Sequence, residues 1–283
     1  MTKPLKLKSG LYVTATPIGN LGDMTERAKQ VLSSVDIIAC EDKRVSGILM
    51  QRFGIKTPMF PYHDHNGDAA RPKIIERIVA GQSVALISDA GSPLVSDPGY
   101  KLVDELRRKN LDVFAVPGAS SPIAALMVAG LPSDRFMFLG FLPNKEKARE
   151  KTLAEVKNTP TTLIFFESSK RVDKSFMAMA KVLGEDRQAA VCREITKLYE
   201  EVRRGSLADL AQQYAEGEAP KGEIVIVVAP PEDKTTAVGD LEEAVRFALE
   251  TLSVKEAASA VAFMMNVPRK KAYQMALDIK NEQ

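Results

Sequence analysis

The sequence has no tryptophan, and its 283 residues include only two cysteines and two histidines. A zinc site needs about four clustered ligands, mostly Cys or His, so we expect no metal site. No apolar run reaches the ~18 residues of a membrane span, and no secretion signal follows the first lysines, so we expect a cytoplasmic protein with no membrane partner. The net charge of +2 leaves any nucleic-acid surface to local patches of charge.

The two cysteines, Cys40 and Cys192, lie at the ends of apolar β-type runs. This placement predicts buried free thiols, which suit a reducing cytoplasm.

Two phosphate-binding patterns are missing or incomplete. The chain contains no G-x-x-x-x-G-K-[ST] motif, which argues against a nucleotide triphosphatase of that type. Residues 19–22, Gly-Asn-Leu-Gly, are a fragment of the G-x-G-x-x-G fingerprint, so a nicotinamide enzyme is only weakly supported.

The order of strands and helices predicts an α/β protein of two α/β domains and a helical tail. Residues 1–118 alternate strands with helices, which indicates a mostly parallel sheet. Residues 119–231 repeat the alternation, and we expect a mixed sheet there. Pro230 and Pro231 begin a linker by composition. Residues 232–283 are predicted to be helical throughout.

The stretch 85–99 predicts a buried strand, a loop of small residues and a helix. Asp97 is predicted as the N-cap of that helix and Pro98 as its first residue. Open α/β sheets place ligands at such junctions. Asp89 lies at the start of the loop, where it either touches the ligand or only holds the loop.

Charged residues follow two strands of the second half. Glu167 either stabilises a helix N-terminus or lines a cleft. Glu194 and Lys197 are either a surface ion-pair cluster or part of the same cleft. His65 belongs to the only histidine cluster, which we interpret as a polar rim loop that could supply a general base.

Basic residues form two local patches. Arg269, Lys270 and Lys271 stand in the first turn of a predicted helix, where the helix dipole disfavours positive charge. Phosphate binding would explain this placement, and a solvated surface is the alternative. Lys145 and Lys147 belong to the second patch.

Several short motifs occur together in one order, and the set resembles a known family. The motifs are ATPIGNL (15–21), ED (41–42), HDHN (63–66), SDAGSP (88–93), SDPGY (96–100), PG (117–118), FLP (141–143), FES (166–168), REITK (193–197) and KGE (221–223). They resemble the tetrapyrrole-methylase-like (class III) S-adenosylmethionine methyltransferases. Within that family, the chain is similar to the branch that methylates the 2′-hydroxyl of a cytidine in the decoding region of 16S ribosomal RNA.

The resemblance implies a homodimer whose two α/β domains hold S-adenosylmethionine in the cleft between them. It implies 16S ribosomal RNA or the 30S subunit as partner, with the basic residues of the tail and of the 145–147 patch as RNA contacts. Cofactor-binding positions carried over from the family, with Asp89 added as the loop residue, are Pro17, Asp89, Gly91, Ser92, Pro93, Ser120, Ser121, Phe166, Lys221 and Gly222. Candidate bases or positioning groups for the ribose hydroxyl are Glu167, Glu194, Lys197 and His65.

Two other functions stay open at this point. A small-molecule methyltransferase acting on tetrapyrrole precursors would share the fold but would not need the basic tail. A non-catalytic RNA-binding protein of ribosome assembly would keep the fold without binding the cofactor.

Overall fold

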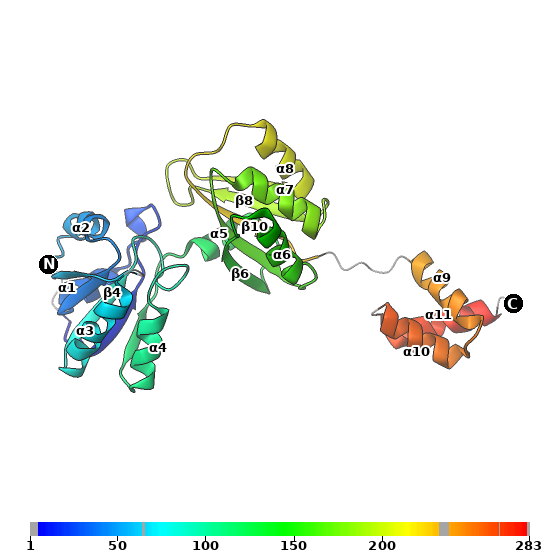
Figure 1. Cartoon of the computed structure of the whole chain (residues 1–283), viewed down its shortest axis with the longest axis horizontal. Helices are drawn as coiled ribbons and strands as arrows, with labels where there is room; N and C mark the ends of the chain where they lie inside the picture. Colours follow the sequence, from blue (N-terminus) through cyan, green and yellow to red (C-terminus); the bar gives the residue numbers. More distant parts are fainter. Residues whose placement is uncertain (1–4, 64–65, 232–237, 266, 282–283) are drawn as a thin grey trace. The chain divides into compact units, whose positions relative to one another are not determined.

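The computed structural model describes residues 5–63, 66–231, 238–265 and 267–281. The chain divides into two compact units, Met1–Pro231 and Glu232–Gln283. The first unit holds both sheets and the second holds three helices (Figure 1). The predicted domain bounds, 1–118, 119–231 and 232–283, stay predictions.

The first sheet is wholly parallel and has the strand order β3-β2-β4-β1-β5. Its strands are β1 (Gly10–Thr14), β2 (Ile37–Cys40), β3 (Met59–Pro61), β4 (Ser83–Ile87) and β5 (Val113–Val116). Every residue of β2 and β4 is buried, as expected for parallel strands covered on both faces. The predicted parallel sheet is confirmed.

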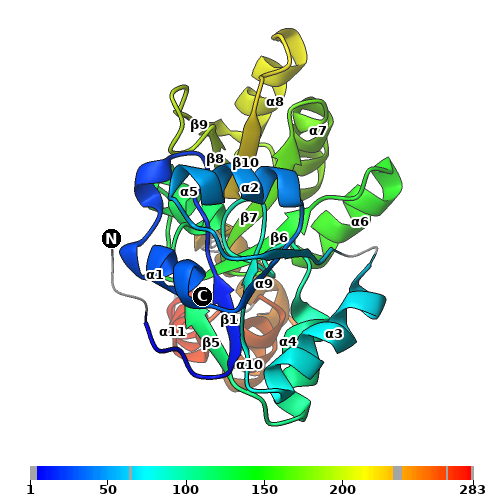
Figure 2. The same cartoon turned by 90° about the vertical axis from the view of Figure 1, so that its left-hand side faces the viewer.

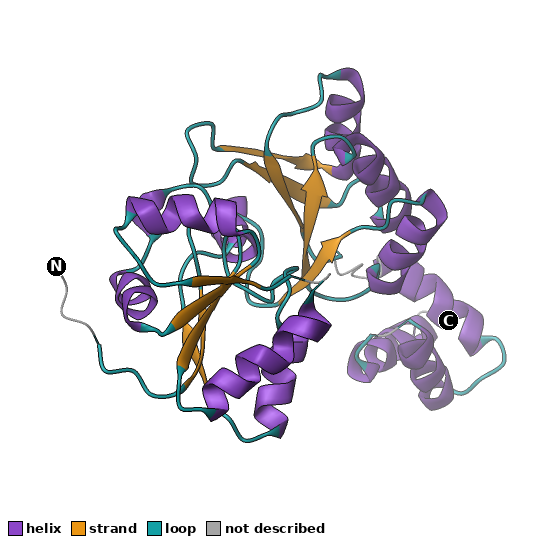
Figure 3. Ribbon diagram, turned by 60° about the vertical axis from the view of Figure 1, so that its left-hand side comes forward, coloured by secondary structure: helices purple, strands orange, loops and turns teal. Residues whose placement is uncertain are grey.

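Helices cover both faces of this sheet (Figure 3). One apolar core joins the sheet to α1 (Glu26–Ser34) and α2 (Lys43–Arg52), and another joins it to α3 (Gly67–Val79) and α4 (Tyr100–Arg108). The helices α3 and α4 lie side by side (Figure 2), where Arg71 Nε donates to Glu105 Oε2 at 2.8 Å. A 3-10 turn, Leu21–Asp23, precedes α1.

The second sheet is mixed, as predicted, with the order β6-β7-β10-β8-β9. Only β6 and β7 pair in parallel, and the other pairs are antiparallel. The strands are β6 (Phe136–Phe141), β7 (Thr162–Ser168), β8 (Gln188–Arg193), β9 (Glu201–Ser206) and β10 (Glu223–Val228). The helix α5 (Ser121–Ala129) packs on one face, while α6 (Glu146–Val156), α7 (Val172–Leu183) and α8 (Leu207–Glu216) pack on the other.

The tail unit has its own small core. It consists of α9 (Val238–Leu249), α10 (Val254–Met264) and α11 (Arg269–Asn281). Leu241, Val245, Val261, Ala276 and Ile279 form the buried cluster that holds the three helices together. The predicted helical tail is therefore confirmed for the described residues.

One local prediction is wrong. The helix α4 begins at Tyr100 with Gly99 at its N-cap, so Asp97 and Pro98 belong to the preceding loop. Gly99 has φ = 138°, and a Cβ there would lie 2.9 Å from Leu86 Cδ2. Only glycine fits this backbone, and the chain enters the helix at this residue.

Two further features concern the cysteines and the lengths of the helices. Cys40 and Cys192 are buried free thiols, as predicted. In the part of the chain that the structure describes, none of the helices has the length and apolarity that crossing a membrane requires.

Candidate active site

The strand order brings three loops to one edge of the first sheet. Strands β4, β1 and β5 are neighbours, so the loops at their carboxyl ends lie together. Thr16 N donates to Gly91 O at 2.8 Å, and Gly91 N donates to Thr16 O at 3.1 Å. Ser92 Oγ donates to Ala119 O at 3.0 Å. These bonds fix the loop after β4 against the other two loops.

The loop from Gly91 to Gly99 has a strained backbone. Leu94 and Ser96 have φ values of 73° and 63°, and both end glycines also have positive φ. Each non-glycine residue in this region costs on the order of 1 kcal/mol or more, and such strain persists where surrounding contacts impose it. Backbone strain of this kind is concentrated at ligand sites.

Asp89 ties this loop to a second one. Its Oδ1 accepts a hydrogen bond from Asp42 N at 3.1 Å, which joins the end of β4 to the residues after β2. Holding the loop is therefore one of its roles.

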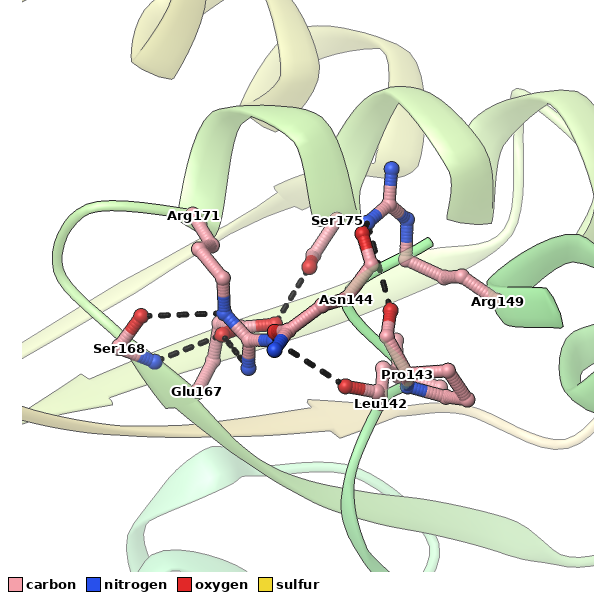
Figure 4. A network of polar contacts seen from close by, with 8 residues as sticks. All are labelled: Leu142, Pro143, Asn144, Arg149, Glu167, Ser168, Arg171 and Ser175. Carbon is pink, nitrogen blue, oxygen red and sulfur yellow. Dashed lines mark hydrogen bonds and ion pairs between the residues drawn. The ribbon is translucent and has the colours of Figure 1, made fainter. Parts of the chain in front are cut away.

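At the second sheet, the carboxylate of Glu167 is buried within a polar network (Figure 4). Its Oε1 accepts from Arg171 Nη2 and from Ser168 N, each at 2.7 Å. Its Oε2 accepts from the hydroxyl of Ser175. Because both oxygens already accept hydrogen bonds from the protein, the carboxylate is better suited to a structural role than to the role of a general base.

Arg171 carries this network to the segment after β6 (Figure 4). Its Nη1 donates to Leu142 O at 3.3 Å and to the side-chain oxygen of Asn144. The ring of Phe141, just before this segment, lies 5.4 Å from the ring of Phe166, centroid to centroid. The network thus fixes two aromatic side chains relative to each other.

Glu194 and Lys197 form the second charged cluster, in the loop between β8 and β9. Lys197 Nζ lies 2.7 Å from Glu194 Oε1 and 3.2 Å from Glu223 Oε2. Glu223 N donates to Glu194 Oε1 at 3.0 Å. The register that pairs Ile224 with Arg193 places these groups together.

The titration of this cluster follows from its contacts. The hydrogen bond from Lys197, with a second from Glu223 N, lowers the pKa of Glu194. Burial of the Lys197 ammonium opposes its charge, but hydrogen bonds with Glu194 and Glu223 outweigh it and raise the pKa of Lys197. Lys197 is therefore a cation at neutral pH, and it does not serve as a base in this state.

Two glycines make room for the cluster. A Cβ on Gly222 would overlap the Glu194 side chain, and one on Gly19 would overlap the Lys197 stem. Gly19 belongs to the loop after β1, so the first sheet contacts the charged cluster of the second sheet at this point.

A first pocket with a cavity volume of about 250 Å³ opens between the loops of the two sheets. This is close to the lower end of the ~300–1,000 Å³ of common ligand sites. Five of the predicted cofactor residues line it, together with the candidate base Glu167: Gly91, Ser92, Ser120, Ser121 and Phe166. Other residues that line it were not predicted as site residues, for example Asp97, Phe141 and Ile195.

A second pocket adjoins the first and is more open. It contains Pro17, Asp89 and Lys197 from the predicted set. Its other wall comes from α2, which contributes Val45, Ile48, Leu49 and Arg52. The sequence analysis did not single out α2.

Of the remaining candidate catalytic and cofactor residues, those that the structure describes line neither pocket. Pro93 is buried, and Lys221 and Gly222 are exposed beside the pockets. Glu194 is linked to the second pocket through its contacts with Lys197 and Glu223. His65 lies outside the described residues.

The five predicted RNA-contacting residues are all exposed. Arg269, Lys270 and Lys271 form the first turn of α11. Lys145 and Lys147 stand at the start of α6, whereas Arg149 of the same basic run is buried. Among the described residues, no group of three or more His, Cys, Asp or Glu side chains is placed to hold a metal ion.

Solved structures share the fold of the first unit. Uroporphyrin-III C-methyltransferase from Thermus thermophilus covers 77% of this chain and 94% of its own, with a TM-score of 0.53 at 21% identity. Diphthine synthase covers 77% of this chain and 89% of its own, with a TM-score of 0.60 at 15% identity. The chain thus shares its fold with these solved structures.

Sequence relatives extend over nearly the whole chain. The ribosomal RNA small subunit methyltransferase I of Mesorhizobium japonicum is 47% identical over 97% of this chain and 94% of its own length. The protein of the same name from Haemophilus influenzae is 41% identical over 94% of this chain and 96% of its own. The family model for tetrapyrrole (corrin/porphyrin) methylases matches residues 10–211, and the model for the RsmI C-terminal HTH domain matches residues 235–280. The chain belongs to the tetrapyrrole methylase family.

Proposed function

We propose that this chain transfers a methyl group from S-adenosylmethionine to the ribose 2′-hydroxyl of a cytidine in 16S ribosomal RNA. The observation that carries the proposal is full-length similarity, tail included, to proteins named ribosomal RNA small subunit methyltransferase I. A methylase of small tetrapyrroles has no use for such a tail, so that alternative is not favoured. The reaction belongs in the cytoplasm, where the small subunit is assembled.

The first pocket fits the methyl donor. S-adenosylmethionine combines an aromatic adenine ring with ribose hydroxyls, a sulfonium and a charged amino-acid end. The pocket offers Phe166 and Ile195 for the ring, serine hydroxyls, and the carboxylate of Asp97 for a cation. Gly91 brings the backbone to the pocket wall, where a Cβ would lie 3.2 Å from Ile18 Cγ2. A solved neighbour in fold, with a TM-score of 0.55 at 17% identity, is described as complexed with S-adenosyl homocysteine.

The donor carries its methyl group on a sulfonium, and the neutral thioether is the leaving group when the methyl group is transferred. The chain's own residues hold the reactants in line, and for well-oriented reactants this contributes up to ~7–11 kcal/mol. Glu167 and Arg171 act as positioning residues, because their network fixes Phe141 and Phe166 at the pocket wall.

The tail is proposed to bind the RNA. Three cations in the first turn of α11 are exposed, and Tyr273 of the same helix keeps 41% of its surface accessible. Positive charge with an exposed aromatic ring is the usual combination for RNA backbone and base contacts. Lys145 and Lys147 are proposed as a second contact to the RNA backbone.

The central test is a methylation assay. The protein is incubated with labelled S-adenosylmethionine and with 30S subunits or naked 16S RNA from a strain that lacks the modification. We expect label on the 2′-oxygen of a single cytidine in the decoding region. Label on a tetrapyrrole precursor instead, or no cofactor binding by calorimetry, would reject the proposal.

A matched pair of variants tests the tail. Lys270→Ala removes one exposed cation from α11, and Lys255→Ala removes one from α10. We expect weaker RNA binding and a flatter salt dependence, by roughly one phosphate contact, for Lys270→Ala alone. Equal loss in both variants would indicate a general charge effect rather than a contact of α11.

We also propose that the chain is a homodimer. The edge strand β6 exposes Phe136, Met137 and Phe141, and the nearby helix α5 exposes Ile123 and Met127. Apolar side chains concentrated beside an unpaired strand edge favour burial against another chain. Sedimentation equilibrium of the wild type and of Met127→Glu tests this, with a monomeric wild type as the contradicting result.

A further inference from the structure

The two pockets of the candidate active site meet at a small set of residues. Three residues line both: Ile18, Ala90 and Glu223. Glu223 is the one member of this set with an ionisable side chain. If the first pocket holds the methyl donor, the acceptor nucleotide enters through the second pocket, and the reacting atoms meet beside these three residues.

The second pocket suits a nucleotide. Val45, Ile48 and Leu49 give it an apolar wall, and Ile48 keeps 72% of its surface exposed. Arg52 and Lys197 supply positive charge within the same pocket. Apolar side chains can pack against a base, and cations beside them can pair with its phosphates.

The other carboxylates near the junction are engaged or displaced from it. Asp97 and Glu167 line the first pocket only, and both oxygens of Glu167 accept hydrogen bonds. Asp89 lines the second pocket only and accepts from Asp42 N. Glu194 lines neither pocket and accepts from Lys197 and from Glu223 N.

Glu223 has a fixed backbone and an accessible carboxylate. Its amide N donates to Glu194 Oε1 and its carbonyl accepts from Glu194 N, each at 3.0 Å. Its side chain is 73% exposed, with Oε2 3.2 Å from Lys197 Nζ. Among the described residues, no hydrogen bond engages Oε1. The carboxylate is therefore held near the junction with one oxygen open to a ligand.

We propose that Glu223 is the general base of the reaction, an inference that rests on the proposed function. As the oxygen–carbon bond forms, the carbon–sulfur bond breaks and its electron pair stays on sulfur, which becomes a neutral thioether. The proton of the ribose hydroxyl passes to Glu223 and from there to solvent, since this side chain is exposed. Lys197 is the positioning residue that holds the carboxylate beside the hydroxyl.

The test compares Glu223→Gln with Glu218→Gln. Both changes remove one exposed negative charge, but Glu218 lines neither pocket. Single-turnover methylation of 30S subunits is measured at saturating S-adenosylmethionine. We expect the rate of Glu223→Gln to fall about 100-fold or more, as for loss of a general base, and Glu218→Gln to keep the wild-type rate. Glu223→Asp should recover part of the loss.

Binding measurements separate catalysis from structure. Calorimetry should give S-adenosyl homocysteine affinities within about threefold of wild type for Glu223→Gln, and filter binding should give unchanged affinity for the RNA. A near-normal rate, or lost cofactor affinity that accounts for the slower rate, would overturn the assignment of Glu223. A wild-type protein that places no label on RNA would instead overturn the proposed function itself.

Discussion

The loops that line the first pocket come from both sheets. The loops of the first sheet, the first edge of the pocket, and those of the second sheet, its second edge, differ in chemistry. At the first sheet, the loops are held chiefly by backbone hydrogen bonds, by a serine hydroxyl and by glycines with positive φ, with one carboxylate contact from Asp89. At the second sheet, the loops are held by charged networks centred on Glu167 and on Lys197. The first edge therefore depends chiefly on backbone contacts, and the second edge depends on ion pairs and hydrogen bonds between charged side chains.

This difference suggests a division of labour. A backbone held close to a pocket recognises the shape of a small molecule and needs small residues at the contact. Buried or half-buried charges carry a desolvation cost, so each needs a fixed partner. We infer that the first edge chiefly binds the methyl donor and that the second edge orients the groups that react.

The largest expected effect comes from breaking the buried network of the second edge. Glu167→Ala leaves Arg171 and Ser175 without their carboxylate, and the Arg171 side chain is only 24% exposed. We expect the free energy of unfolding to fall by about 3 kcal/mol, as when one partner of a buried ion pair is removed. Urea unfolding measures it, with Glu155→Ala, an exposed carboxylate of α6, as control. A loss below about 1 kcal/mol would mean that the network contributes no more to stability than an exposed ion pair does.

The sequence was sufficient for the architecture because the pattern of strands is local. Continuous apolar runs such as 84–87 are typical of buried parallel strands, and β4 is buried throughout. The strand β9 was not predicted, because Glu201, Arg203 and Arg204 make it too polar for an apolar pattern. It pairs only with β8 at the sheet edge, where charged side chains remain solvated.

The site could be predicted only in part, because its contacts depend on how strands distant in sequence pair and on how the loops fold. Gly91 and Ser92 were predicted from motifs and do line the first pocket. Asp97 was assigned to a helix start from the local Asp-Pro pattern, but the strained loop ends at Gly99 and leaves Asp97 in the pocket. Glu223 was missed as a site residue, because its place beside Lys197 follows from the pairing of β10 with β8.

At the first edge, Gly91→Ala and Gly81→Ala sharpen the comparison. Both glycines have positive φ, 79° and 90°, so alanine strains the backbone in both. At Gly91 the new Cβ also meets Ile18 at 3.2 Å, whereas nothing lies within 4 Å at Gly81. We expect Gly91→Ala alone to weaken S-adenosylmethionine binding, by about tenfold, or ~1.4 kcal/mol. Calorimetry measures it, and equal affinities for both variants would show that the loop contact does not shape the pocket.

The smallest expected effect comes from the cation of the second edge. Lys197→Met keeps the stem that packs against Gly19 but removes the charge shared with Glu194 and Glu223. The pair is partly buried, with 25% of the Lys197 side chain and 17% of the Glu194 side chain exposed, so the loss of unfolding free energy should be about 1 kcal/mol near neutral pH. Lys101→Met, a change of an exposed residue of α4, serves as control and should leave stability within about 0.5 kcal/mol.

The pH dependence of that loss has a definite sign. The hydrogen bond from Lys197 lowers the pKa of Glu194 below its ordinary value of 4.5, so the folded state holds the proton less tightly than the unfolded state. The stabilisation is therefore complete above pH 4.5 and disappears as the pH falls through the lowered pKa of the folded protein. The difference in unfolding free energy between wild type and Lys197→Met should be largest near neutral pH and should disappear in acid. Urea unfolding at neutral and at acidic pH measures it. A difference that does not change with pH would mean that Lys197 stabilises this edge through the packing of its stem and not through its charge.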